Sequence, residues 1–267
     1  ACNIAFSLSQ RMVCDSIKIM ENKPRGLYGM HGPVQSYTIW FSQRTGSTLL
    51  NKALQSTGIA GNPAEWFLGK EPQQMDRNYI KKIWEQGTTP NGVFGVKCNL
   101  DLERFSVLKK IFDLPALASR PEIWETAFPN CKHIYMTRRN RVRLAASWWR
   151  AIVSGEWHRE HGVKPPQHEI ADLYKFEAIQ HLIQESVMQE AAIEDFLSEG
   201  GIVPLTIVYE DFVLDYEGTV RKVLEFIGIP SNQAVIAPPA LDKLADEVTE
   251  EWVQRYRRES QAGWLGE

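Results

Sequence analysis

Cysteine is scarce in this sequence, and its placement excludes the common cysteine motifs. The 267 residues include only four cysteines, and these are far apart: Cys2, Cys14, Cys98 and Cys131. No two of them form a C-x-x-C pair, so the spacing predicts neither a zinc site nor a dithiol redox centre. We therefore expect reduced thiols in a cytoplasmic protein.

Long hydrophobic runs are also missing. No apolar stretch approaches the ~20 residues that a membrane-spanning helix needs. Residues 1–15 lack a basic segment followed by a long apolar one. The sequence therefore predicts neither a membrane span nor a signal peptide.

Neither sign of charge dominates the chain. Its 30 basic and 33 acidic residues give a formal net charge of −3. No overall positive field would attract nucleic acid, so we expect no nucleic-acid partner. A local basic cluster can still hold a small anionic ligand.

The histidines do not follow a metal-binding pattern. His158, His161 and His168 lie close together in the sequence, but their spacing is not that of one helical face. A polar loop is the preferred interpretation over a zinc site. We therefore expect no metal in this protein.

The pattern of apolar residues predicts an α/β fold. Short runs rich in β-branched and aromatic residues predict strands at 36–41, 92–97, 133–137 and 202–209. Helical periodicity predicts a helix with Ser47 as its N-cap and Gly58 just beyond its end, and further helices at 141–154, 169–199, 216–227 and 246–260. This alternation indicates a central, mainly parallel sheet with helices on both faces, which is a three-layer α/β sandwich.

The chain is predicted to form one domain. Residues 1–35 mix polar and apolar positions without a clear period, and we expect an irregular N-terminal extension there. The loops at 161–167 and 229–239 contain proline but are too short for interdomain linkers. Residues 36–267 are therefore interpreted as a single domain.

The most informative segment lies between the first strand and the first helix. It lacks the G-x-x-x-x-G-K-[ST] pattern of nucleotide triphosphatases. Backbone N–H groups and the helix dipole at a helix start nevertheless favour a bound phosphate. Here a cation, a glycine and hydroxyl groups accompany that helix start. The residues that we assign to this candidate phosphate loop are Gln43, Arg44, Thr45, Gly46, Ser47 and Thr48. A serine-capped helix after a polar turn would show the same pattern.

A second basic cluster follows the strand at 133–137. Arginines occupy positions 138, 139, 141 and 143, and Ser147 follows on the same predicted helix. Guanidinium groups suit phosphate oxygens, and a serine adds a hydroxyl donor. A solvated basic helix face is the alternative. Because open α/β sheets bind ligands at the carboxyl ends of their strands, we expect this cluster to meet a second phosphate.

Together these segments resemble the sulfotransferases that use 3′-phosphoadenosine-5′-phosphosulfate (PAPS), and among them the mycobacterial trehalose 2-sulfotransferase family. The resemblance extends from about Tyr37 to Arg258. It rests on the order and spacing of five segments: 42–50 (SQRTGSTLL), 61–67 (GNPAEWF), 92–97 (GVFGVK), 147–151 (SWWRA) and 251–258 (EWVQRYRR). Residues 1–35 and 155–170 depart from that branch, so the resemblance does not define the acceptor.

The resemblance implies a division of roles within the site. The loop of Arg44 would bind the 5′-phosphosulfate, and either Arg138 or Arg139 would bind the 3′-phosphate together with Ser147. Two basic residues of the C-terminal helix, Arg257 and Arg258, would add phosphate contacts.

Three residues are predicted to be catalytic. The family assigns the general base to the position of Glu65, where neighbouring aromatic residues would form an apolar wall and raise the pKa of the carboxyl group. Lys97 and Arg44 would stabilise charge on the transferred and departing groups. Lys97 has a second interpretation, in which it is simply the first exposed residue after a buried strand.

The sequence thus predicts a sulfotransferase that moves a sulfuryl group from PAPS, its co-substrate, to a hydroxyl of a small acceptor by in-line transfer without a metal. A sugar such as trehalose is one acceptor class, and O- or N-sulfation of a non-sugar natural product is an alternative. Two other functions stay open, namely a P-loop-type kinase and a non-catalytic nucleotide-binding module. The resemblance is also compatible with a homodimer.

Overall fold

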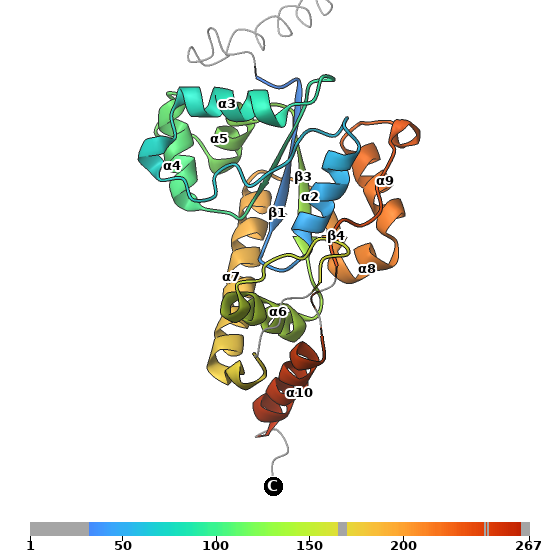
Figure 1. Ribbon diagram of the computed structural model, residues 1–267. Helices are drawn as coiled ribbons and strands as arrows, with labels where there is room; N and C mark the ends of the chain where they lie inside the picture. Colours follow the sequence, from blue (N-terminus) through green and yellow to red (C-terminus); the bar gives the residue numbers. More distant parts are fainter. Residues whose placement is uncertain (1–31, 165–169, 243, 245, 263–267) are drawn as a thin grey trace, which may run out of the picture.

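A four-stranded parallel sheet forms the centre of the protein. The computed structural model describes residues 32–164, 170–242, 244 and 246–262 (Figure 1). The strands lie in the order β2-β1-β3-β4, and every neighbouring pair is parallel. Their bounds are Gln35–Phe41 for β1, Val93–Cys98 for β2, Cys131–Thr137 for β3 and Leu205–Val208 for β4. All four predicted strands are confirmed. β4 is shorter than predicted and starts after Pro204, since proline has no N–H for a sheet hydrogen bond.

Helices cover both faces of this sheet (Figure 1). One face packs against α3 (Arg77–Gly87), α4 (Leu102–Ile111), α5 (Arg120–Ala127) and α7 (Phe176–Glu199). The other face packs against α2 (Ser47–Ser56), α8 (Tyr209–Leu214) and α9 (Tyr216–Phe226).

The side chains of β1 show how the two layers form. Tyr37 and Ile39 belong to the cluster with α2 and α9, whereas Trp40 belongs to the cluster with α5 and α7. Successive side chains of a strand point to opposite faces, so one strand supplies both cores. The predicted three-layer α/β architecture is confirmed.

Two further helices pack together beyond the sheet. They are α6 (Arg141–Ser154) and α10 (Glu247–Gln261), which form a third apolar cluster with part of α7. Single turns of 3₁₀ helix occur at Pro72–Gln74, Ala171–Leu173 and Ser231–Gln233. Within the described residues, no helix combines the length and the apolar character that crossing a membrane requires.

The predicted helices agree with the structure except at certain ends. The helix at 141–154 is confirmed with the same bounds, and α9 and α10 begin or end within one residue of prediction. α7 begins only at Phe176, because a 3₁₀ turn and an extended residue precede it; residue 169 lies outside the described residues.

The predicted caps of α2 had different outcomes. Gly58 follows the helix with a φ of 66° and donates its N–H to the carbonyl of Gln55, as predicted. The N-cap prediction was wrong: the N-cap is Gly46 in a left-handed conformation, and Ser47 is the first helical residue. Of the predicted extension, residues 1–31 lie outside the described part, and Gln35 already belongs to β1.

Candidate active site

A cavity of about 810 Å³ opens where the four parallel strands end. Its wall includes Lys97 from β2, Gln43 and Arg44 from the loop after β1, and Arg138 and Tyr209, which directly follow β3 and β4. This is the edge at which open α/β sheets bind ligands. Arg143 of the second basic cluster lies on this wall. So do nine of the residues that were assigned to the site individually: Gln43, Arg44, Gly46, Ser47, Thr48, Glu65, Lys97, Arg138 and Ser147.

The loop between β1 and α2 has a tightly constrained backbone. Arg44 and Gly46 both have positive φ angles, of 64° and 83°. A Cβ atom on Gly46 would lie 2.6 Å from the ring of Tyr209, so only glycine fits there without displacing that ring. This conformation places the first turn of α2 on the cavity wall, where N–H groups without helical partners favour an anion.

Two arginines meet beside this loop. The Nε atom of Arg44 donates to Ser147 Oγ at 3.1 Å, and its Nη1 atom donates to the carbonyl of Trp157 at 2.6 Å. Arg138 donates from Nη1 to the carbonyl of Arg44 at 3.3 Å, and its guanidinium lies 4.5 Å from the ring centroid of Tyr209. The strands therefore bring the two predicted basic clusters into direct contact.

The close approach of these cations affects their protonation. Burial, together with the nearby Arg138 charge, lowers the pKa of Arg44 to about 10. Burial also lowers the pKa of Arg138, against the opposing effects of Tyr209 and Glu210. Two neighbouring cations that burial removes from water would be stabilised by anionic groups of a ligand. The donor set therefore fits a phosphate-bearing ligand.

A chain of polar contacts joins the other predicted catalytic residues. Lys97 Nζ lies 2.7 Å from Glu65 Oε1 and donates to Thr48 Oγ1 at 2.8 Å. The backbone explains this pairing, because Lys97 N–H donates to the carbonyl of Ala64, next to Glu65. Lys97 is only 4% exposed and lies inside β2, so its interpretation as the first exposed residue after a strand was wrong.

The surroundings of Glu65 differ from those expected. Trp66 donates its indole N–H to the carbonyl of Gly95, and Phe67 is buried in the core below. The nearest charged neighbour of the carboxylate is instead the ammonium of Lys97. Burial lowers the pKa of Lys97, and the Glu65 carboxylate opposes that effect. The two side chains form an ion pair at the cavity wall.

The segment after α6 was predicted as a polar loop, and its contribution to the cavity was missed. Trp157 and His158 lie on the cavity wall, and His158 Nε2 is 3.4 Å from Thr48 Oγ1. Burial, followed by the charges of Arg44 and Lys97, lowers the pKa of His158 to about 4. The imidazole is thus neutral at neutral pH. Its closeness to Thr48 arises from the tertiary fold, which histidine spacing does not reveal.

That segment is fixed by contacts at both of its sides. Lys52 pairs with Glu160 at 3.0 Å, and the N–H of His161 donates to the carbonyl of Ala240. The carbonyl of Arg159 accepts from the N–H of Asp242. In the parts of the chain that the structure describes, no group of three or more His, Cys, Asp or Glu residues is arranged to hold a metal ion; His168 lies outside these parts.

Four predicted binding residues lie elsewhere. Thr45 belongs to the loop but is fully buried, and its Oγ1 donates to the carbonyl of Ser42. Arg139 is exposed and pairs with Asp211. Arg257 and Arg258 belong to α10, whose contribution to the cavity wall is Thr249. Their contacts with a ligand stay predictions.

Comparison with known proteins identifies the family. The family model described as Stf0 sulphotransferase matches residues 36–78 and 68–259. The chain belongs to this family. The resemblance predicted from the sequence is thereby confirmed.

Two relatives of this chain are trehalose 2-sulfotransferases. Those of Mycolicibacterium smegmatis and Mycobacterium tuberculosis are each 28% identical to it, over 86% of this chain and 97% of theirs. Among solved structures, a sulfotransferase from Alicyclobacillus acidocaldarius aligns with a TM-score of 0.49 and 14% identity, over 86% of this chain and 95% of that one. A mouse sulfotransferase in complex with PAP aligns with a TM-score of 0.41 and 14% identity, over 90% and 71% of the two chains.

Proposed function

We propose that this protein moves the sulfuryl group of PAPS to a hydroxyl of a small acceptor. The observation that carries the proposal is the meeting of Arg44 and Arg138 on one cavity wall, close to the Glu65–Lys97 pair. Family membership supports sulfuryl transfer, and a bisphosphorylated nucleotide donor matches two neighbouring cationic loops.

The donor would be bound through its two ends. The start of α2, with Arg44, Ser47 and Thr48, would bind the 5′-phosphosulfate. Arg138 and Ser147 would bind the 3′-phosphate. Arg138 is preferred over Arg139, because Arg138 lies on the cavity wall whereas Arg139 is paired with Asp211.

The chemistry would use the pair of opposite charges at Glu65 and Lys97. The acceptor hydroxyl gives its proton to Glu65 as its oxygen attacks sulfur, and the bond between sulfur and the bridging phosphate oxygen breaks. Lys97 and Arg44 stabilise the negative charge that develops on the departing phosphate. An anionic donor competes for Lys97 and thereby releases the Glu65 carboxylate for proton transfer.

The acceptor is proposed to be a sugar such as trehalose. The names of the two mycobacterial relatives support this class. The partly exposed ring of Trp157 at the cavity edge offers an apolar face on which a sugar ring can stack. A non-sugar natural product sulfated on oxygen or nitrogen is the alternative.

An acceptor screen tests this proposal. The protein is incubated with sulfur-labelled PAPS and with trehalose, other sugars, or amine- and phenol-bearing metabolites, and the products are separated. Label in a sugar fraction that needs active protein supports the proposal. Label only in an amine or phenol fraction supports the alternative acceptor class, and the absence of labelled product from every acceptor contradicts both.

A further inference from the structure

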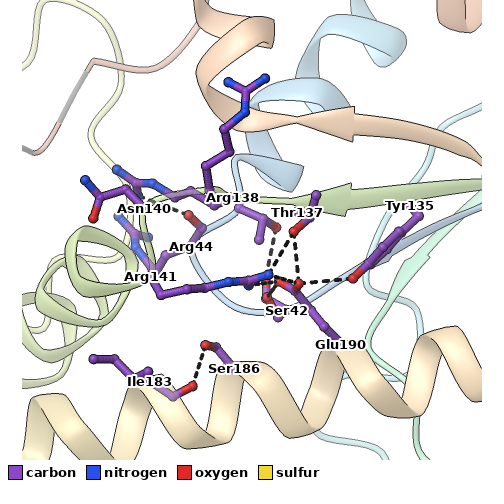
Figure 2. A network of polar contacts seen from close by, with 12 residues as sticks. Ser42, Arg44, Tyr135, Thr137, Arg138, Asn140, Arg141, Ile183, Ser186 and Glu190 are labelled. Atoms are coloured by element: carbon purple, nitrogen blue, oxygen red, sulfur yellow. Dashed lines mark hydrogen bonds and ion pairs between the residues drawn. The ribbon is translucent and has the colours of Figure 1, made fainter.

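Glu190 carries a buried carboxylate in the interior of α7. It is only 4% exposed. Arg141 pairs with both of its oxygens, and Ser42 Oγ donates to Oε1 at 2.8 Å. Tyr135 and Thr137 donate their hydroxyls to Oε2 at 3.0 and 2.9 Å (Figure 2). A buried charge is stable only when it is paired and hydrogen-bonded in this way.

The partners of Glu190 lie at the carboxyl end of β1 and around the junction between β3 and α6. Ser42 directly follows β1 and precedes the candidate phosphate loop, and its carbonyl accepts from Thr45 Oγ1 within that loop. Thr137 ends β3, and Arg141 begins α6, so they flank Arg138 in the sequence. One carboxylate therefore links the segment that follows β1 to the segment that joins β3 and α6 (Figure 2).

The electrostatics show that the site is built for a charged group. Burial raises the pKa of Glu190, but hydrogen bonds from Arg141 and Ser42 lower it by more, and the pKa lies below its ordinary value. The carboxylate is thus ionised at neutral pH. An uncharged residue of the same shape would lose the pairing with Arg141.

Glu190 and its four partners all lie outside the cavity wall that the described residues form. Any effect on a ligand must therefore pass through the loops that they hold. We propose that Glu190 is a positioning residue that fixes the spacing between the Arg44 loop and the Arg138 loop. This spacing lets a ligand with two separated phosphates contact both loops at once, and the inference rests on the proposed donor.

The positioning role predicts a particular pattern of affinities. A ligand with one phosphate engages one loop, and its affinity depends little on the distance between loops. A ligand with two phosphates gains from simultaneous contact only when the spacing is right. The direct contact between Arg138 and the Arg44 carbonyl would persist without Glu190, so the gain would be reduced but not abolished.

The test measures by calorimetry how tightly the wild type and the Glu190→Gln variant bind three nucleotides. These are adenosine 3′,5′-bisphosphate, adenosine 5′-monophosphate and adenosine 3′-monophosphate. The affinity for the bisphosphate should fall roughly tenfold. The affinities for the two monophosphates should change by about twofold or less. Glu194→Gln is the matched control, because Glu194 accepts from the same Tyr135 hydroxyl but contacts neither loop, and its three affinities should equal those of the wild type.

Unchanged bisphosphate affinity in a folded Glu190→Gln protein would overturn the inference, as would an equal loss for all three nucleotides. A lower melting temperature alone would mean that Glu190 serves stability only. If Glu190→Gln does not fold, the same three affinities are measured on Ser42→Ala. This substitution removes the hydrogen bond between Ser42 and Glu190 and leaves the Arg141–Glu190 pair intact. Wild-type protein that does not bind the bisphosphate would instead contradict the proposed donor itself.

Discussion

The Nζ atom of Lys97 lies 2.7 Å from Oε1 of Glu65, so the proposed base and the proposed phosphate-binding cation form one ion pair. Lys97 is almost fully buried, whereas the Glu65 side chain is 30% exposed and faces the cavity. In the proposed reaction, this arrangement would place the carboxylate beside the acceptor hydroxyl and the cation where negative charge develops. It also means that neither residue acts independently of the other.

Glu65→Gln should separate donor binding from turnover. The substitution keeps the size of the side chain and a hydrogen-bond acceptor for Lys97 but removes the base. Turnover should fall ~10²–10⁴-fold, the usual contribution of a positioned general base. Affinity for adenosine 3′,5′-bisphosphate should be retained. Single-turnover kinetics beside a titration measures both, with exposed Glu103→Gln on α4 as the control. Near-normal turnover would assign proton removal to another group or to solvent.

Arg138→Ala and Arg139→Ala should differ in their effect on nucleotide affinity. Arg138 lies on the cavity wall and contacts the Arg44 carbonyl, so its loss should weaken bisphosphate binding by ~1.5–3 kcal/mol. Arg139 forms an exposed pair with Asp211, and its loss should change affinity little. Calorimetric titration of the two variants decides which arginine holds the 3′-phosphate. The opposite order of affinities would assign that role to Arg139.

His158 should be neutral in the free protein and gain a proton more easily when the donor product binds. Its pKa lies at about 4 in the folded chain, well below its ordinary value of roughly 6.5. Between about pH 4 and 6.5 the unfolded chain therefore binds more protons than the folded chain. The free energy of unfolding should fall as the pH drops from about 6.5 towards 4.

Nuclear magnetic resonance measures this directly. The ring signals of His158, assigned by their absence in His158→Gln, should not titrate between about pH 5.5 and 8. Bound bisphosphate should raise the pKa, because its negative charge offsets those of Arg44 and Lys97. Titration near the ordinary value in the free protein would show that the ring is not buried beside the charges of Arg44 and Lys97.

Gly46→Ala should destabilise the protein more than Gly58→Ala. Both glycines have positive φ angles, so both substitutions carry a conformational cost of about 1–2 kcal/mol. An added Cβ on Gly58 meets no atom within 4 Å, whereas on Gly46 it would lie 2.6 Å from the Tyr209 ring. Thermal and denaturant unfolding compare the two, and bisphosphate affinity should fall only for Gly46→Ala. Equal destabilisation would mean that Tyr209 moves away without cost.

The fold was largely predictable because it follows from local patterns. β1 and β2 contain apolar and β-branched residues, and α6 has a clear helical period that ends at Gly155, its C-cap residue. By contrast, α3, α4, α5 and α8 were not among the predicted helices. α5 has only eight residues and its start depends on a capping box between Ser119 and Glu122. Short helices of this kind are stabilised by tertiary packing, which periodicity does not report.

The site was predictable where it follows strand ends, and less so elsewhere. Arg44, Lys97 and Arg138 meet because parallel strands end at the same edge of the sheet. His158 and Trp157 reach the cavity through a segment whose path depends on contacts with residues 240–242, more than seventy-five residues later in the sequence. Such long-range contacts have no local signal. The same holds for Glu190, which accepts from Ser42 although 148 residues separate the two in the sequence.

The most direct test of the account is a calorimetric titration of the wild-type protein with adenosine 3′,5′-bisphosphate and, in parallel, with ATP and magnesium. The meeting of Arg44 and Arg138 on one wall predicts tight binding of the bisphosphate, weak binding of ATP, and loss of the preference in Arg44→Ala. Tight binding of ATP with no measurable binding of the bisphosphate would contradict the proposed donor and favour a kinase-like mechanism.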